Sequence, residues 1–392
     1  MRLWSLSQKR PIHNPQCSFL LEGSLNIELF EQAIVQVMQR HEILHTLFYQ
    51  APGMEIPVQV VSENVKVSYQ IISLMHLDEA AKAVQLDEHF ARLQELSYDL
   101  EQGPLWRVWL LRLTPQRHVV LLGCSGLCAD AASLPLLLQA WRQAYSGVPW
   151  QEEEPLQYAD VAQWRLELAE DAQLQEGRHY WQALPLEEFA RQPLPYQRSG
   201  SWSPASPDGQ EERREHYYEL ELDLEQARVL EQCSQQQQVW RETVLLAGWL
   251  ALWWRLTQQD QLRLGVQADG RPYEELGGVL GPCSELLPLQ IELVAGLSWQ
   301  HLLQRVQRVL QEGREHQLAF AGTPGEQQAL AVSFRYLNWP QQSWAPGVHS
   351  RLLRLSNWPE AVALSLLVLD LGETVRLHLR SGRLAGSDLA RL

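Results

Sequence analysis

A segment that cannot form a hydrophobic core interrupts the chain near its middle, from Arg191 to Glu215. It holds four prolines, the cluster Ser199–Ser203 and a charged run over Glu211–Glu215. Too few apolar side chains are present there to offset the entropy lost on folding, so the segment is typical of an exposed linker. A length of 392 residues agrees with about two domains of roughly 150–200 residues each. The sequence therefore predicts a lobe over residues 1–190, a linker over 191–215 and a second lobe over 216–392.

Each predicted lobe begins with a strand followed by a helix, which predicts an α/β fold. In the first lobe, Cys17–Glu22 is the expected strand, and Asn26 can cap the helix that follows. In the second lobe, Tyr217–Leu222 alternates like a half-buried strand, and a helix with Leu224 and Leu230 on one face comes next. This echo indicates either two related halves or an arrangement common to α/β proteins, and the sequence leaves both open.

Two strands and a helix in the first lobe enclose a short loop. Trp106–Leu113 and His118–Cys124 are the expected strands, and the second is apolar enough to be buried on both faces. A helix then begins with Ser133 as its N-cap and ends at Gly147. Residues 125–132 are therefore expected to form a loop between a buried strand and a helix.

Charge and composition exclude several classes of protein. A net charge of −15 and a pI near 5.3 argue against nucleic acid as a partner, since phosphates need a basic surface. The longest apolar run, Val244–Trp254, is too short to span a membrane, and residues 1–10 lack the apolar region of a signal peptide. The five cysteines form no CxxC pair, so neither a disulfide framework nor a zinc cluster is indicated. We expect a cytoplasmic protein without a metal site.

Two short motifs each admit a catalytic interpretation that their surroundings weaken. His41, Glu42 and His45 match the zinc-protease pattern HExxH, which needs both histidines on one helix face. However, Leu44–Phe48 is expected to contain the end of a helix and the start of a strand. Gly123–Leu127 is similar to a GxSxG nucleophile elbow, but its last position is leucine, where the sharp turn needs a small residue.

Five segments spread along nearly the whole chain carry further information when they are taken together: Leu6–Arg10, Arg40–Phe48, Gly103–Arg107, Tyr158–Trp164 and Gly265–Gly281. In this order they resemble motifs of the condensation domain of nonribosomal peptide synthetases. The resemblance implies two chloramphenicol-acetyltransferase-like lobes in a V arrangement, with a central tunnel that two carrier proteins enter from opposite faces. Each carrier would bring a phosphopantetheine thioester, so the domain would need no cofactor of its own.

The chain departs from this family where the chemistry should be. The family's motif HHxxxDG is replaced by Ser125-Gly126-Leu127-Cys128-Ala129-Asp130-Ala131. The second histidine, which assists attack of an acceptor amine, falls on Gly126, and glycine has no side chain to move a proton. Ser125 replaces the first histidine and is not a base unaided. The resemblance also implies a structural salt bridge between Asp130 and Arg271, and we predict no catalytic residue.

The preferred hypothesis is a catalytically inactive, condensation-like "interface" domain of a synthetase that serves as a docking platform. It would recruit a trans-acting tailoring oxygenase, a non-haem iron β-hydroxylase, to a carrier-bound aminoacyl thioester in siderophore or peptide biosynthesis. An alternative is a condensation domain that forms the peptide bond by positioning two carrier-bound thioesters. An epimerisation- or cyclisation-like relative is a third possibility, although Ser125–Asp130 reproduces neither motif.

The expected partners are a peptidyl or aminoacyl carrier protein, the tailoring oxygenase and neighbouring synthetase domains. No nucleic acid or membrane is expected among them. The sequence does not identify the partner surface. Exposed tryptophans are common anchors of interfaces, and the candidates are Trp202 and the segment Trp339–Trp344, although burial is the commoner fate of tryptophan.

Overall fold

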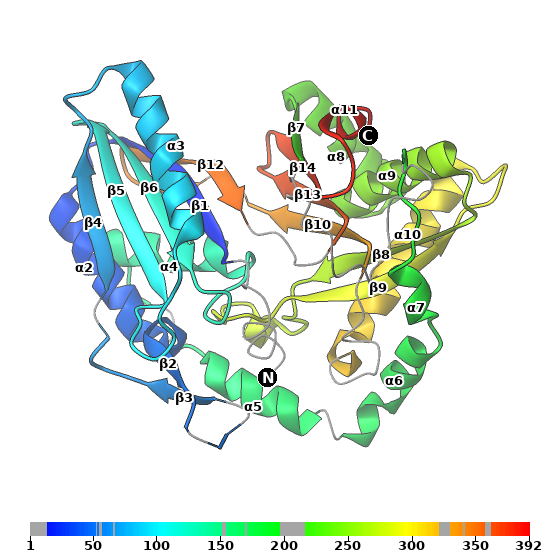
Figure 1. Cartoon of the computed structure of the whole chain (residues 1–392), viewed down its shortest axis with the longest axis horizontal. Helices are drawn as coiled ribbons and strands as arrows, with labels where there is room; N and C mark the ends of the chain where they lie inside the picture. The colour runs from blue at the N-terminus through cyan, green and yellow to red at the C-terminus, as the bar shows by residue number, and fades with distance from the viewer. Residues whose placement is uncertain are drawn as a thin grey trace, which may run out of the picture. The chain divides into compact units, whose positions relative to one another are not determined.

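The computed structural model describes residues 14–51, 53–54, 57–65, 67–150, 154–168, 171–196, 216–320, 330–339, 342–356 and 362–392 (Figure 1). The chain divides into two compact units, and each contains a six-stranded mixed sheet. Unit 1 is built from Met1–Trp164, Tyr273–Ser284 and Gln341–Glu360. Unit 2 is built from Arg165–Pro272, Glu285–Pro340 and Ala361–Leu392.

The sheet of unit 1 has the strand order β11-β12-β1-β6-β5-β4. Neighbouring strands are antiparallel except for β4 and β5, which are parallel. A separate antiparallel pair is formed by β2 (Thr46–Tyr49) and β3 (Val58–Val61). The sheet strands are β1 (Gln16–Gly23), β4 (Ser68–Ser73), β5 (Trp106–Thr114), β6 (Arg117–Cys124), β11 (Ser343–Ala345) and β12 (Val348–Ser356).

Helices cover both faces of this sheet. On one face, α2 (Ile27–Arg40) and α4 (Ser133–Tyr145) contribute to a buried aromatic cluster of Phe19, Phe30, Trp141 and Trp344. On the other face, α3 (Glu79–Glu95) packs Phe90 and Leu93 against leucines, a valine and a tryptophan of β1, β5 and β6 (Figure 1). Strand β6 is therefore buried on both sides, as its continuous apolar run predicts.

The sheet of unit 2 has the order β7-β14-β13-β10-β8-β9. Strand β10 is parallel to β8 and β13, and the remaining pairs are antiparallel. Its strands are β7 (His216–Leu222), β8 (Gln261–Ala268), β9 (Glu285–Glu292), β10 (Val332–Asn338), β13 (Leu364–Asp370) and β14 (Val375–Ser381). The helices are the end of α5 (Tyr158–Leu168), α6 (Gln175–Gln182), α7 (Leu186–Phe189), α8 (Leu224–Gln237), α9 (Arg241–Thr257), α10 (Trp299–Glu315) and α11 (Gly386–Leu389).

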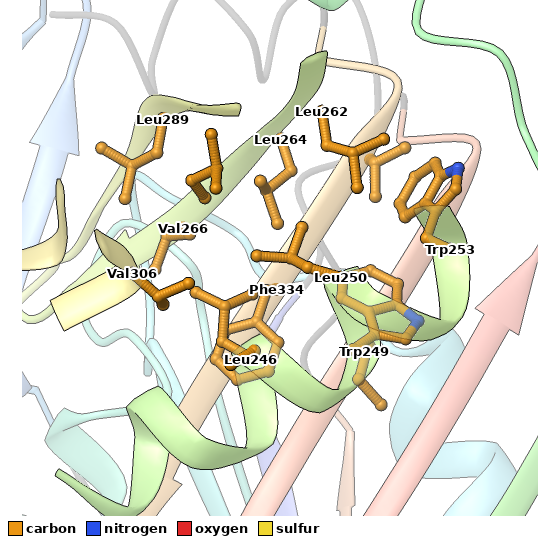
Figure 2. Close-up of a cluster of buried hydrophobic side chains, with 14 of the residues drawn as sticks. Leu246, Trp249, Leu250, Trp253, Leu262, Leu264, Val266, Leu289, Val306 and Phe334 are labelled. Atoms are coloured by element: carbon orange, nitrogen blue, oxygen red, sulfur yellow. The ribbon is translucent and has the colours of Figure 1, made fainter. Parts of the chain in front are cut away.

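The core of unit 2 lies between one face of its sheet and the helices α8, α9 and α10. Figure 2 shows Leu246, Trp249 and Leu250 of α9 facing side chains of β8 and β10. Helix α9 is apolar almost all round because it is buried here, as its sequence predicts. No helix within the described ranges is both long and apolar enough to cross a bilayer.

The strand–helix unit expected at the start of each lobe is present. In unit 1, β1 is followed by α2, and the Asn26 side chain accepts a hydrogen bond from Leu29 N at 3.1 Å. In unit 2, β7 is followed by α8, whose N-cap is Asp223. Each cap satisfies one backbone N–H that the first helical turn leaves without a partner. These predictions of local structure are confirmed.

The compact units differ from the predicted boundaries at residues 190 and 215. The first boundary falls after Trp164, and two segments of the second half of the chain belong to unit 1. Long-range pairing is the reason, since β12 extends the sheet of unit 1 along β1 from Gln16↔Ser356 to Gly23↔Val348. Of the predicted linker, residues 197–215 lie outside the described residues.

Trp344 is expected to stabilise unit 1 strongly, since it is 2% exposed and stacks on Phe19 at 5.5 Å. Trp344→Ala should cost about 3–5 kcal/mol, because it leaves a large cavity in the aromatic cluster. The matched control is Trp299→Ala, at a side chain that is 44% exposed. Urea unfolding followed by circular dichroism measures both variants. Equal losses in the two would contradict the assigned packing.

Candidate functional site

The loop over residues 125–132 begins where β6 ends, and backbone hydrogen bonds fix its path. Ser125 N donates to Leu105 O at 2.7 Å, which attaches the loop to the residue before β5. Cys128 N and Ala129 N then donate to Ser125 O at 2.9 and 3.0 Å. The loop is therefore a closed turn with defined geometry, at the place that the sequence predicts.

Ser125 and Gly126 supply no group that can act as a base. The Ser125 hydroxyl is buried and accepts a hydrogen bond from Leu127 N at 3.3 Å, within its own turn. Within the described ranges, no histidine or carboxylate bonds to this hydroxyl. Gly126 takes part through its backbone alone, donating its N–H to Asn14 Oδ1 at 3.1 Å. A serine without an adjacent base is a weak nucleophile.

Asp130 is the centre of the loop's polar contacts. Its Oδ1 accepts from both the backbone N and the hydroxyl of Ser133, each at 2.7 Å. Its Oδ2 accepts from the backbone N and the hydroxyl of Ser284, at 2.7 and 2.8 Å. One carboxylate therefore holds the first residue of α4 and, 154 residues further along the chain, the end of the segment Tyr273–Ser284.

The predicted cap of α4 is displaced by this arrangement. Ser133 is the first helical residue rather than the N-cap, and Ala132 at the N-cap position makes no side-chain capping bond. The Ser133 hydroxyl instead lies 2.7 Å from Asp130 Oδ1 and 2.8 Å from Gly281 O, and it accepts from Gly281 N at 3.2 Å. Its single proton serves one acceptor at a time. Asp130 supplies the acceptor for the first N–H of α4.

Gly281 lets the segment Tyr273–Ser284 approach α5 closely. Its φ is +153°, and a Cβ built there would lie 2.2 Å from the ring of Tyr158. Val161 on α5 packs with Leu276 and Val279 of the segment in a small buried cluster. Glycine is required at 281 by both the backbone conformation and the close approach.

Arg271, the predicted partner of Asp130, belongs to unit 2. There its guanidinium donates to Asp269 O at 3.0 Å and also pairs with the Asp269 carboxylate, and its side chain is 1% exposed. The neighbouring Gly270 O accepts from Arg165 Nη2 at 2.6 Å. The salt bridge between Asp130 and Arg271 stays a prediction. Ala131, the last altered position of the motif, is buried.

The cysteines around the loop are buried and have unreactive, protonated thiols. Cys17, Cys124 and Cys128 are each 0% exposed. Burial raises the pKa of the Cys128 thiol to about 12, and its Sγ donates to Ile43 O at 3.3 Å. Thiols with such pKa values stay protonated at neutral pH and are poor nucleophiles. The prediction that Cys124 and Cys128 are buried packing residues is confirmed.

The HExxH residues do not share a helix face. Helix α2 ends at Arg40, a 3-10 turn follows over Glu42–His45, and β2 begins at Thr46, as predicted. His41 is 6% exposed, and burial, with a smaller effect of Arg40, lowers its pKa to about 4. His45 Nδ1 lies 3.3 Å from Ser62 O. Among the residues that the structure describes, no three His, Cys, Asp or Glu side chains could hold a metal ion together.

The family follows from a comparison with family models, since the model of the condensation domain matches residues 2–320. The chain belongs to the condensation-domain family. Members of this family act on thioesters borne by carrier proteins and include both catalytic and inactive domains. Chondramide synthase cmdD of Chondromyces crocatus is 27% identical over 330 residues, which cover 81% of this chain and 8% of the synthase. The chain therefore spans only a small part of this relative.

Solved condensation-domain structures confirm the expected two-lobed α/β fold. The condensation domain of the Monacolin K polyketide synthase MokA has a TM-score of 0.81 at 19% identity, with 98% of this chain and 91% of that chain covered. The X-domain from teicoplanin biosynthesis has a TM-score of 0.73 at 20% identity, covering 99% and 90% of the two chains. The X-domain in its complex with OxyB has a TM-score of 0.71 at 20% identity, with 99% of this chain and 88% of that chain covered.

Two of the tryptophans named as candidate surface anchors are buried, which is the alternative that the sequence analysis left open for them. Trp344 is part of the core of unit 1, and Trp339 is 8% exposed, with its backbone N bonded to Asp370 O at 2.7 Å. Trp202 lies outside the described residues. The sequence analysis also missed Asn14 and Ser284. No local pattern marks either residue, because both act on partners more than 100 positions away.

Asp130→Ala should lower the free energy of unfolding by about 2–4 kcal/mol, because two serines and two backbone N–H groups lose a charged acceptor. Ser284→Ala should cost less, about 1 kcal/mol. The double variant should show coupling of about 1 kcal/mol or more in a thermodynamic cycle. Asp99→Ala is the matched control, since Asp99 is exposed and accepts only from nearby backbone in its own turn. Additive losses from Asp130→Ala and Ser284→Ala would contradict the shared contact.

Stability should fall as the pH drops from about 6.5 towards 4, because the unfolded chain protonates His41 in this range while the folded chain does not. The lowered pKa corresponds to a loss of up to about 3 kcal/mol. His41→Gln should flatten this part of the profile, whereas His349→Gln, at an exposed histidine, should leave it unchanged. Unfolding midpoints in urea between pH 4 and 8 provide the measurement. An equally steep profile in His41→Gln would exclude this assignment.

Proposed function

We propose that this domain has lost the condensation reaction and serves as a docking platform within a nonribosomal peptide synthetase. In this role it recruits a trans-acting tailoring oxygenase, a non-haem iron β-hydroxylase, to an aminoacyl thioester on a carrier protein. One observation carries the proposal: glycine stands where the family's reaction needs a histidine, while the scaffold around Asp130 keeps its hydrogen bonds.

The step that this loop lacks a group for is the removal of one proton from the attacking amine. An acceptor amine that attacks a thioester must give up a proton, and a positioned base contributes about 10²- to 10⁴-fold to such a step. Gly126 offers only a backbone N–H, and that group already donates to Asn14. The Ser125 hydroxyl accepts a bond from its own turn, and no base within the described ranges bonds to it. The loop thus retains its form without a group for proton transfer.

A docking role has a precedent among the structural relatives. The X-domain from teicoplanin biosynthesis shares this fold and has been solved in complex with OxyB. A fold of this kind can therefore present a surface to a second protein. The phosphopantetheine arm would come with the carrier protein, and the domain would act in the cytoplasm beside neighbouring synthetase domains.

A condensation domain that works by positioning alone is the second candidate. The ordered loop favours it, because holding two thioesters in place can supply much of the rate of a bimolecular step. The two candidates differ in what Gly126 should contribute. If the domain only docks a partner, the residue at position 126 should not affect hydroxylation of the carrier-bound amino acid. If it catalyses condensation, that residue should limit the rate of amide formation.

The first test is calorimetric titration of the domain with each non-haem iron oxygenase encoded in the same gene cluster, with and without the aminoacylated carrier. We expect binding at micromolar concentration or tighter, and hydroxylation of the carrier-bound amino acid that depends on the domain. Failure of every oxygenase to bind would overturn the recruitment role.

The second test is a condensation assay with two loaded carriers, comparing the wild type with Gly126→His and, as control, Ser125→Ala. We expect no amide product above the uncatalysed rate in the wild type, and unchanged oxygenase binding in all three proteins. Amide formation by the wild type, raised at least 10²-fold by Gly126→His, would support the condensation candidate instead. Circular dichroism confirms that each variant is folded.

A further inference from the structure

Among the strands that the structure describes, β7 leaves one edge of the sheet of unit 2 open along residues 218–221. It is the terminal strand, paired with β14 from Leu222↔Val375 to His216↔Ser381, and no other described strand pairs with it (Figure 1). Side chains at positions 217–221 are all exposed. A strand of this kind presents backbone N–H and C=O groups to any extended segment that reaches it.

Other sheet edges are less suited to a specific partner. Strand β9 carries Pro288, which removes a backbone donor, and most of its side chains are buried or half-buried. Strand β11 has three residues. Strand β4 has an exposed edge but no charged side chain to select a partner. Only β7, among these edges, combines exposed apolar and charged side chains along its length.

The side chains in the middle of β7 differ in chemistry between the two faces of the sheet. Glu219 and Glu221 point to one face, and their side chains are 58% and 48% exposed. Tyr217 points to the same face and is 57% exposed. Tyr218 and Leu220 point to the other face and are 37% and 47% exposed. The strand therefore displays an acidic stripe, Glu219 and Glu221, on one face and an apolar stripe, Tyr218 and Leu220, on the other.

Strand β14 holds one glutamate of the acidic stripe in place. Arg376 Nε donates to Glu221 Oε2 at 2.7 Å. His378 Nδ1 lies 3.6 Å from Glu219 Oε2, too far for a hydrogen bond, and burial lowers the pKa of this histidine. Each carboxylate has a second oxygen and several lone pairs, so it can accept from a further cation across the open edge. Glu221 is thus ordered before a partner arrives, which favours binding.

A second copy of this chain fits the edge poorly in two antiparallel registers. In an antiparallel pairing of β7 with itself, side chains on the same face lie opposite one another. Two such registers place Glu219 opposite another Glu219 or opposite Glu221, whereas a third places it opposite Tyr217. Like charges directly opposite each other destabilise a pair of strands. The acidic stripe therefore disfavours self-association in the first two registers.

We infer that the open edge of β7 binds an extended segment of a partner protein in which basic and apolar residues alternate. Such a segment adds a seventh strand to the sheet of unit 2, its basic side chains facing Glu219 and Glu221 and its apolar side chains covering Tyr218 and Leu220. Backbone hydrogen bonds supply affinity and the alternation supplies selectivity, as in other cases of strand addition. This surface is independent of the reaction at the loop of unit 1.

The test titrates the whole 392-residue chain with an acetylated, amidated peptide of sequence Lys-Val-Arg-Val-Lys-Val-Arg, followed by calorimetry and by amide hydrogen exchange. We expect saturable binding and slowed exchange confined to β7 at its open edge. Two control peptides are a version with glutamates at the basic positions and a version N-methylated at alternate residues, which keeps the charges but removes edge donors. Both should bind at least tenfold more weakly.

Two matched protein variants each remove two negative charges, one pair on β7 and the other pair in unit 1. Glu219→Gln/Glu221→Gln should weaken binding by roughly 3- to 30-fold, as expected for two exposed ion pairs. Glu95→Gln/Glu101→Gln, at exposed positions of unit 1, should leave it unchanged. The inference would be overturned if the N-methylated peptide bound as tightly as the parent peptide, or if both double variants lost the same affinity. It would also be overturned if millimolar peptide gave no protection of β7, or if sedimentation showed a dimer in which β7 is protected from exchange.

Discussion

The carboxylate of Asp130 is the contact on which the geometry of unit 1 depends. Four donors lie within hydrogen-bond distance of it, two from the start of α4 and two from Ser284, and one of them, the Ser133 hydroxyl, is shared with Gly281 O. Because one oxygen serves each side, the loop after β6, the first turn of α4 and the segment Tyr273–Ser284 cannot move independently. Gly281 and the ring of Tyr158 then fix how closely that segment approaches α5. Charged acceptors of this kind make stronger hydrogen bonds than neutral ones.

This dependence explains how a domain of this family can lose its reaction and keep its fold. A histidine at position 126 would serve the reaction, and its absence removes no hydrogen bond from the scaffold, because Gly126 contributes through its backbone N–H. Loss of Asp130 would instead leave the Ser284 hydroxyl and the backbone N–H groups of Ser133 and Ser284 without this acceptor, at a cost that is a large fraction of a typical protein's stability. Asp130 therefore serves the fold of unit 1, whatever the loop does.

Local structure could be predicted well from the sequence, and long-range structure could not. The start of α2 at Asn26 and the buried strand β6 follow from periodicity and capping, which depend on residues close in sequence. The addition of β12 to the sheet of unit 1 and the bond from Ser284 to Asp130 join residues far apart in the chain. Trp344 shows the same limit, since composition alone does not separate a core tryptophan from an interface anchor, and only the ring of Phe19 against it decides.

The candidate site and the open edge of β7 illustrate opposite uses of polar groups. Around the loop of unit 1, His41 is neutral, the thiols are protonated and the hydroxyl of Ser125 is bonded within its own turn, so burial has removed charge and reactivity. On β7 the two glutamates stay half exposed, and Arg376 orients one of them, Glu221. A buried polar group gains stability by being satisfied internally, whereas recognition requires acceptors that still face solvent.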